Sequence, residues 1–153
     1  EAQLDRFMFN IWVDYPTYAE ELAVVKATTG DQRPTISPVL TSDEILGYQS
    51  LVRRIPVADN VLEYAVKLAT RTRPGTPGAP AIITDHLSWG AGPRASQFLV
   101  VGAKCHALAH GRFSPDIADV QAVALPILRH RLVRNYKAEA EGITVDRIVE
   151  AIL

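Results

Sequence analysis

Only one segment of the 153-residue chain has the pattern of a β-strand, and this limits what the chain can fold into. Residues 7–13, FMFNIWV, combine aromatic and β-branched side chains with partial alternation, which is typical of a strand. A single strand leaves its backbone hydrogen-bonding groups unsatisfied, so it needs partner strands in a sheet. We expect those partners to lie upstream of Glu1, and we interpret the chain, which does not begin with methionine, as a piece of a longer protein.

The remainder of the chain is punctuated as a series of helices. Thr17 with Glu20 and Thr41 with Glu44 have capping-box spacing, in which each side chain binds a backbone N–H of the other residue. With apolar periodicity and stops at glycine or proline, these signals predict a mainly α fold. We expect helices over about 17–29, 41–55 and 58–72, from Pro93 onwards, from Ser114 with a kink or break at Pro126, and from Thr144 onwards.

The connection over residues 73–93 is long for a compact domain. It is dense in glycine and proline and shows no sustained helical period. Connections of this length are usually functional or mobile. This one leads directly into the sequence GPRAS at residues 92–96, and a short extended piece is expected later, near residues 131–133.

Composition excludes several classes of protein. The net charge is −1 with 22% charged residues, which does not favour a protein whose main role is to bind nucleic acid or an anionic membrane surface. The single cysteine, Cys105, cannot form an internal disulfide and fits a reducing compartment. No apolar run approaches the length of a membrane helix and no secretion leader is present, so we expect a cytoplasmic protein without membrane insertion.

Arg94 occupies a position where a helix disfavours a cation. Pro93 suits the first helical position, which places Arg94 in the first turn, at the positive end of the helix dipole. One interpretation is that the side chain bends towards water or a neighbouring carboxylate. The other is that an anionic ligand binds at this point.

Other clusters of reactive residue types carry weaker signals. His106 and His110 are one helical turn apart, with Cys105 beside them, but no second ligand pair accompanies them. We therefore predict no metal site and interpret both histidines as surface residues near a helix C-terminus. Residues 85–88 contain aspartate, histidine and serine, crowded in one loop without a nucleophile elbow, so a hydrolytic triad is not expected.

Residues 129–137, RHRLVRNYK, form the most basic cluster and include one aromatic residue. Such clusters occur on nucleic-acid-binding surfaces, but Glu139 and Glu141 follow at once and restore the charge balance. We interpret the cluster as a solvated face or an intersubunit contact. Binding of nucleic acid through it is the weaker alternative, and it would show a steep dependence on salt.

Three stretches together resemble a known family, the MoxR-type AAA+ ATPases. They are EAQLDRFMFNIWVDYP at the start, WGAGPRAS in the middle, and LPILRHRLVRNYKAEAEGITVDRIVEAIL at the end. The resemblance covers essentially the whole chain and corresponds to the C-terminal third of that family. It implies a helical lid domain over residues 15–153, preceded over residues 1–14 by the end of an α/β ATPase core with one strand.

The resemblance also implies site residues and partners. Arg6 in QLDRF is similar to the family's arginine finger, which acts in trans on a neighbouring subunit. Arg94 is similar to the family's sensor 2 residue, and the resemblance places Gly92 and Pro93 beside the nucleotide. The implied ligands are ATP and Mg²⁺. The implied assembly is a homo-oligomer, usually a hexameric ring, that remodels or matures partner proteins such as those with von Willebrand factor A domains.

What the chain lacks limits its own activity. It contains no GxxxxGK[ST] loop and no strand that ends in a magnesium-binding acidic pair, so we expect no ATP hydrolysis by this chain alone. The alternative interpretation is a non-catalytic helical interaction or scaffolding module, in which Arg6 and Arg94 form structural salt bridges.

Overall fold

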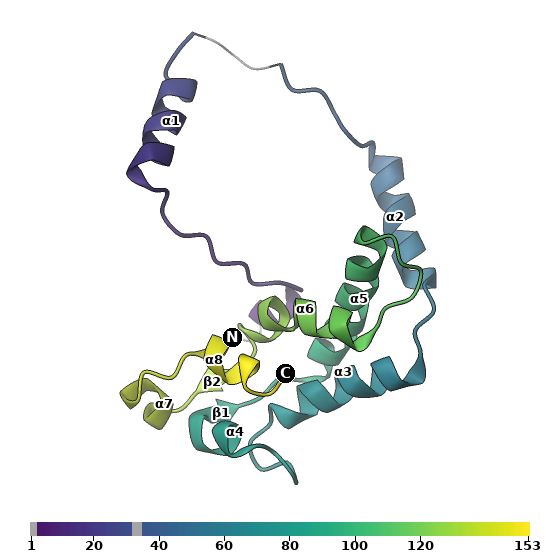
Figure 1. Cartoon of the computed structure of the whole chain (residues 1–153), viewed down its shortest axis with the longest axis vertical. Coiled ribbons are helices and arrows are strands. Elements are labelled where there is room, and N and C mark those ends of the chain that lie inside the picture. The colour runs from purple at the N-terminus through teal and green to yellow at the C-terminus, as the bar shows by residue number, and fades with distance from the viewer. Residues whose placement is uncertain (1–2, 32–34) are drawn as a thin grey trace.

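The computed structural model describes residues 3–31 and 35–153 and is mainly helical, as the sequence predicts (Figure 1). The described elements in chain order are the 3-10 turn η1 (Leu4–Arg6), helices α1 (Tyr18–Thr28), α2 (Ser42–Arg54), α3 (Asp59–Arg71) and α4 (Ala81–His86), strand β1 (Leu87–Trp89), helices α5 (Pro93–Ala109) and α6 (Ile117–Leu128), strand β2 (Val133–Arg134), and helices α7 (Tyr136–Ala140) and α8 (Val145–Glu150). Among these residues, no helix is long and apolar enough to span a membrane.

Helix α5 lies at the centre of the core and packs against α3 and α6. Apart from Ile55, the buried side chains of the described residues come from α3 onwards, and the largest fully buried ones include Val61, Ile83, Leu99, Val120, Ile127, Leu128, Ile148 and Val149. Gly102 permits the close approach of α6, because a Cβ atom there would lie 3.1 Å from Cγ2 of Val123 and 3.2 Å from Cδ1 of Ile127. The core therefore depends on small residues along the α6-facing side of α5.

Both predicted capping boxes are confirmed. The backbone N–H of Thr17 donates to the carboxylate of Glu20 at 2.8 Å, and that of Thr41 donates to Glu44 at 2.7 Å. Helix α1 nevertheless has no buried residue and stands away from the other helices at the end of long connections (Figure 1). Its cap determines where it begins, but within the described residues no packed face stabilises it.

The strand predicted over residues 7–13 is wrong for the chain as the structure describes it, because these residues form no strand. The backbone N–H of Asn10 donates to the carbonyl of Pro126 at 2.8 Å, which is a contact with a helix and not with a sheet. A strand requires a partner strand, and none of the described segments pairs with this one. The β-favouring side chains of Phe7, Ile11 and Val13 remain largely exposed.

The connection over residues 73–93 contains more structure than the sequence predicts. It holds α4, which is too short to show a helical period, and β1, which pairs antiparallel with β2. In this pair Leu87 lies opposite Arg134, Trp89 lies opposite Val133, and the register shifts between them. The extended piece expected at residues 131–133 is observed slightly later, at β2.

The start of α6 differs from expectation, and Pro126 does not break the helix. The N-cap is Asp116 and not Ser114, because Asp116 and Asp119 form a capping box. Pro126 lies inside the last turn of α6 without ending it, and its carbonyl accepts the Asn10 N–H. The prediction that Thr144 caps the last helix is confirmed, since its side chain accepts the backbone N–H of Arg147.

Candidate functional site

The loop that precedes α5 is held by the end of α3. The hydroxyl oxygen of the buried Thr72 accepts the backbone N–H of Ala91 at 2.8 Å and donates to the carbonyl of Ala69 at 2.6 Å. Nε of Arg73 donates to the carbonyl of Ala91 at 2.8 Å. Gly90 lies so close to this turn that a Cβ atom would be 2.3 Å from the carbonyl oxygen of Thr72. The position of the GPR sequence is therefore set by packing and hydrogen bonds and not by the loop alone.

Helix α5 begins as the sequence predicts. Gly92 is the N-cap residue, with extended backbone and no capping side chain, and Pro93 is the first helical residue. Arg94 therefore lies in the first turn, and its half-exposed guanidinium donates from Nη1 to Oδ2 of Asp5 at 2.9 Å. Of the two interpretations of Arg94, the structure places a carboxylate against it, from a residue 89 positions earlier in the chain.

Asp5 lies between two arginines. Its Oδ2 accepts from Arg94, and its Oδ1 accepts from Nε of Arg131, also at 2.9 Å. Asp5 belongs to η1 and directly precedes Arg6. Sequence reasoning missed Asp5 and Arg131, although Asp5 lies inside the QLDRF motif and Arg131 inside the basic cluster, because nothing in either motif indicates that the two meet.

Arg131 is buried and fastens the N-terminal segment to the helical domain. Its side chain is 2% exposed, and Nη2 donates to the carbonyls of Asp5 at 2.9 Å and Phe7 at 2.6 Å. Its guanidinium carbon lies 5.1 Å from the ring centre of Phe98. Burial lowers the pKa of Arg131 and the Asp5 carboxylate opposes this shift, so the ion pair keeps a charge that burial alone would disfavour.

The two basic residues before Arg131 also bind the N-terminal segment. Nε2 of His130 lies 3.1 Å from the carbonyl of Phe7, and burial lowers the pKa of His130, which favours its neutral form at pH 7. Arg129 forms a bidentate pair with Asp146, at 2.9 and 2.7 Å, and lies 4.5 Å over the ring of Trp12. The interpretation of the cluster as a solvated face is therefore wrong for residues 129–131, which bind residues 5–12 of the N-terminal segment.

Arg6 is exposed at the end of η1. Within residues 3–31 and 35–153 it forms no salt bridge, and the Asp5 carboxylate beside it is taken by Arg94 and Arg131. Glu1 lies outside the described residues. The geometry leaves the Arg6 side chain facing solvent next to the residue that binds Arg94.

One of the histidines considered as metal ligands and two of the residues considered as a hydrolytic triad bind other side chains of the fold. Nδ1 of His106 lies 2.6 Å from Oδ1 of the buried Asp119, so His106 is not simply a surface residue. At the end of α4, His86 binds Glu141 at 2.9 Å, and Asp85 binds Lys137 at 3.3 Å, so no triad forms there. The described part of the chain contains no group of three or more residues able to hold a metal ion.

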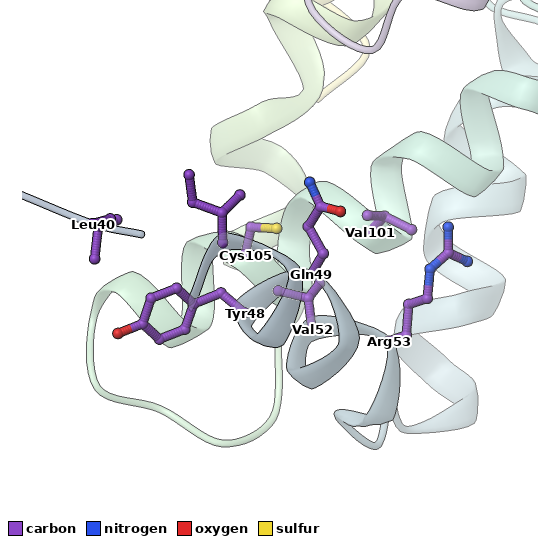
Figure 2. Close-up of a pocket in the computed structure, with 8 residues that line it drawn as sticks. Leu40, Tyr48, Gln49, Val52, Arg53, Val101 and Cys105 are labelled. Carbon is purple, nitrogen blue, oxygen red and sulfur yellow. The ribbon is translucent and has the colours of Figure 1, made fainter. Parts of the chain in front are cut away.

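Two cavities differ in character. One, of about 260 Å³, lies beside the Asp5 carboxylate, and its lining includes Gly90, Gly92, His130 and Arg131. The other, of about 440 Å³, lies between α2 and α5 (Figure 2) and is lined by Leu40, Ile45, Tyr48, Gln49, Val52, Arg53, Val101 and Cys105. Burial raises the pKa of Cys105, and among the lining residues only Arg53 is charged. The second cavity is therefore an apolar surface and not a site for a phosphate.

The close approach at Gly90 predicts a difference between two neighbouring glycines. Gly90→Ala is expected to lower the free energy of unfolding by about 1–3 kcal/mol or more, because the added methyl group meets backbone atoms that cannot rotate away. Gly92→Ala meets nothing within 4 Å and is expected to cost about 1 kcal/mol or less, through its weaker N-cap preference. Urea unfolding of both variants measures this, and equal losses would contradict the contact.

Comparisons with known proteins identify a domain family and three similar proteins. Residues 79–152 match the family model of the AAA lid domain. The chain is 32% identical over its full length to the uncharacterised protein YeaC of Bacillus subtilis and 31% identical to the chaperone MoxR1 of Mycobacterium tuberculosis. A crystal structure of a candidate ATPase from Cytophaga hutchinsonii superposes with a TM-score of 0.87 and 30% identity, over 99% of this chain. The chain spans 45%, 40% and 46% of these three proteins, respectively, which is less than half of each.

Proposed function

The chain belongs to the MoxR-type AAA+ ATPases, and we propose that it forms the C-terminal part of one that couples ATP binding and hydrolysis to chaperone-like remodelling of partner proteins. In this proposal residues 1–14 end the ATPase core and residues 15–153 form the lid. The match of residues 79–152 to a lid model supports the second assignment. The printed name of the relative MoxR1, a chaperone, supports the remodelling role.

The observation that carries the proposal is the placement of Arg94. Its guanidinium lies at the start of α5, where the helix dipole and first-turn N–H groups favour an anion, and a held loop sets its position. Arginine suits a phosphate because its charge is permanent and its planar fork spans two oxygens. In the proposed role, sensor 2, Arg94 binds the γ-phosphate of ATP, with Gly92 and Pro93 beside the nucleotide.

The Asp5 carboxylate does not prevent this role. The pair between Asp5 and Arg94 is partly exposed, at 36% and 44% of the two side chains, and such pairs contribute only about 0–1 kcal/mol. A triphosphate carries more negative charge than one carboxylate and can replace it. The existing pair shows that an anion fits against Arg94 at 2.9 Å.

The residues present fit one part of a nucleotide site. Arg94 fits a phosphate, whereas the sequence contains no phosphate-binding loop to hold Mg²⁺ and the remaining phosphates. In the proposal those groups come from the rest of the longer protein, where Mg²⁺ would neutralise charge on the phosphates. The proposed assembly is a cytoplasmic homo-oligomeric ring, hexameric as is usual in the family, in which Arg6 acts on the nucleotide of the adjacent subunit. Proteins with von Willebrand factor A domains are the proposed partners.

Arg94→Ala tests the proposal in the full-length protein. Hydrolysis is expected to fall about 10- to 100-fold, because a hydrogen-bonded contact with a charged group is lost. The lid is expected to keep its fold, since removal of a cation from a helix start does not weaken the helix. Steady-state ATPase assays and thermal unfolding measure the two effects, with the exposed Arg54→Ala at the end of α2 as the matched control. A variant that unfolds would identify Arg94 as a structural residue instead.

One observation favours the second candidate, a non-catalytic helical interaction module. The salt bridge between Arg94 and Asp5 is also what a purely structural arginine would form. The two candidates differ in what accompanies the chain, since a phosphate-binding loop in the full-length protein fits only the ATPase. In the module, Arg94→Ala would leave nucleotide turnover unchanged.

A further inference from the structure

We propose that Asp5 is a positioning residue that couples Arg94, in the nucleotide site of its own subunit, to Arg6, which acts on the adjacent subunit. This inference rests on the proposed function. The coupling consists of competition: the phosphate of bound nucleotide and the Asp5 carboxylate both bind Arg94, and when the phosphate binds, the turn that carries Arg6 loses one of its attachments.

The first step is the geometry of η1. Asp5 and Arg6 are consecutive residues of a three-residue turn. The backbone N–H of Arg6 donates to the carbonyl of Gln3 at 3.2 Å, and that of Phe7 donates to Leu4 at 3.1 Å. Because these bonds close the turn around Asp5, a displacement of Asp5 also changes the direction of the Arg6 side chain.

The second step is the difference between the two arginines that bind Asp5. Arg131 is 2% exposed and also binds the backbone carbonyls of Asp5 and Phe7, so it keeps its place whatever the Asp5 side chain does. Arg94 is 44% exposed and, among the described residues of this segment, binds only the Asp5 carboxylate. Arg131 is therefore the permanent attachment of η1, and Arg94 is the attachment that a ligand can remove.

The third step follows from thermodynamic linkage. If the contact with Asp5 weakens the binding of phosphate to Arg94 by some factor, bound phosphate weakens the contact with Asp5 by the same factor. A nucleotide in one subunit therefore changes the attachment of the turn whose next residue faces the adjacent subunit.

Asp5→Asn in the full-length protein tests the competition. The amide keeps the shape of the side chain and leaves the backbone bonds to Arg131 in place, so the fold is expected to persist. A non-hydrolysable ATP analogue is expected to bind about two- to five-fold more tightly, because the competing charge is lost from a partly exposed pair. In an Arg94→Ala background the same substitution is expected to change affinity by less than twofold. Asp14→Asn, an exposed acid of the same segment, is the matched control.

Hydrogen exchange tests the connection to Arg6. In the wild-type protein the analogue is expected to speed exchange at the backbone N–H groups of Arg6 and Phe7, and in Asp5→Asn this response is expected to disappear. If Asp5 had only a structural role, Asp5→Asn would bind the ATP analogue more weakly than wild type or with the same affinity. Either result would overturn the proposal. The proposal would also be overturned if Asp5→Asn raised the affinity for the analogue in the Arg94→Ala background. The same holds if the analogue did not change the rate of hydrogen exchange at η1.

The failure of this inference is distinguishable from failure of the proposed function. If Arg94 does not sense nucleotide, Arg94→Ala by itself leaves analogue binding and hydrolysis unchanged. If Arg94 senses nucleotide but Asp5 does not compete, Arg94→Ala impairs hydrolysis while Asp5→Asn binds the analogue like wild type.

Discussion

Arg6→Ala in the full-length protein is expected to bind ATP with unchanged affinity and to hydrolyse it about 10³- to 10⁵-fold more slowly, the range found for arginine fingers. In the proposed role, the arginine stabilises charge that develops on the transferred phosphoryl group and contributes little to ground-state binding. The side chain is exposed at the end of η1, while its turn is attached to the helical domain through Asp5 and Arg131. An exposed cation on an attached turn is what action across a subunit boundary requires.

A mixing experiment separates action in trans from action within one subunit. Arg6→Ala protein is combined with a second variant that is defective in its own phosphate-binding loop. A mixed ring then contains interfaces at which one intact loop faces one intact arginine, so some hydrolysis is expected to return. If Arg6 acted within its own subunit, no subunit in the mixture would hold both parts and activity would stay absent.

The controls for this experiment are the assembly and a neutral substitution. Mixed rings are verified by co-purification of differently tagged subunits, and the exposed Lys26→Ala in α1 is expected to hydrolyse ATP like wild type. Unchanged hydrolysis by Arg6→Ala rings would show that Arg6 has no catalytic role. Failure to recover activity in confirmed mixed rings would exclude action in trans.

The longer helices were predictable because their signals are local, whereas the short helices α4 and α7 were not predicted. Thr17 with Glu20 and Thr41 with Glu44 specify helix starts within four residues, and both capping boxes form. The strand expected at residues 7–13 and the observed β1 show the opposite case, since a strand exists only where a partner is present. The partner of β1 lies more than 40 residues later in the chain, and no local sequence pattern predicts this pairing.

The candidate site also contains one part that the local sequence predicts and another part that it does not. The position of Arg94 in the first turn followed from Pro93 alone, and the structure places it there. Its partner Asp5 is 89 residues away, and Arg131 is 126 residues from Asp5. Contacts at this separation depend on how the whole chain folds back, so the sequence left open whether water, a carboxylate or an anionic ligand meets Arg94.

Asp119 is a buried charged residue in the first turn of α6. Its carboxylate accepts from Nη1 of Arg112 at 2.6 Å, from Nδ1 of His106 at 2.6 Å, and from the backbone N–H of Asp116 at 2.8 Å. The last of these bonds completes the capping box of α6. The Arg112 guanidinium, with the Asp116 N–H and His106, holds the pKa of Asp119 well below its usual value, although burial acts in the opposite direction.

Asp119→Asn is expected to lower the free energy of unfolding at pH 7 by about 3 kcal/mol, because charge-assisted bonds are lost at a buried position. This loss of unfolding free energy is at the lower end of the range for a broken buried ion pair. The reason is that Arg112 is 45% exposed, so water can solvate its guanidinium when the pair is broken. Asp43→Asn, an exposed first-turn acid of α2, is expected to change stability by less than about 0.5 kcal/mol.

The pH dependence gives this prediction a second, independent measurement. A carboxyl whose folded pKa is lowered stabilises the fold fully above its unfolded pKa, about 3.9, and loses that contribution as pH falls towards the folded value. Wild-type stability is therefore expected to decline between about pH 5 and pH 2 more steeply than that of Asp119→Asn, whose amide does not titrate. Urea unfolding across this range measures both slopes. If the two declined in parallel, the Asp119 carboxylate would not be ionised and paired in the folded chain, and the loss at pH 7 would have to come from packing alone.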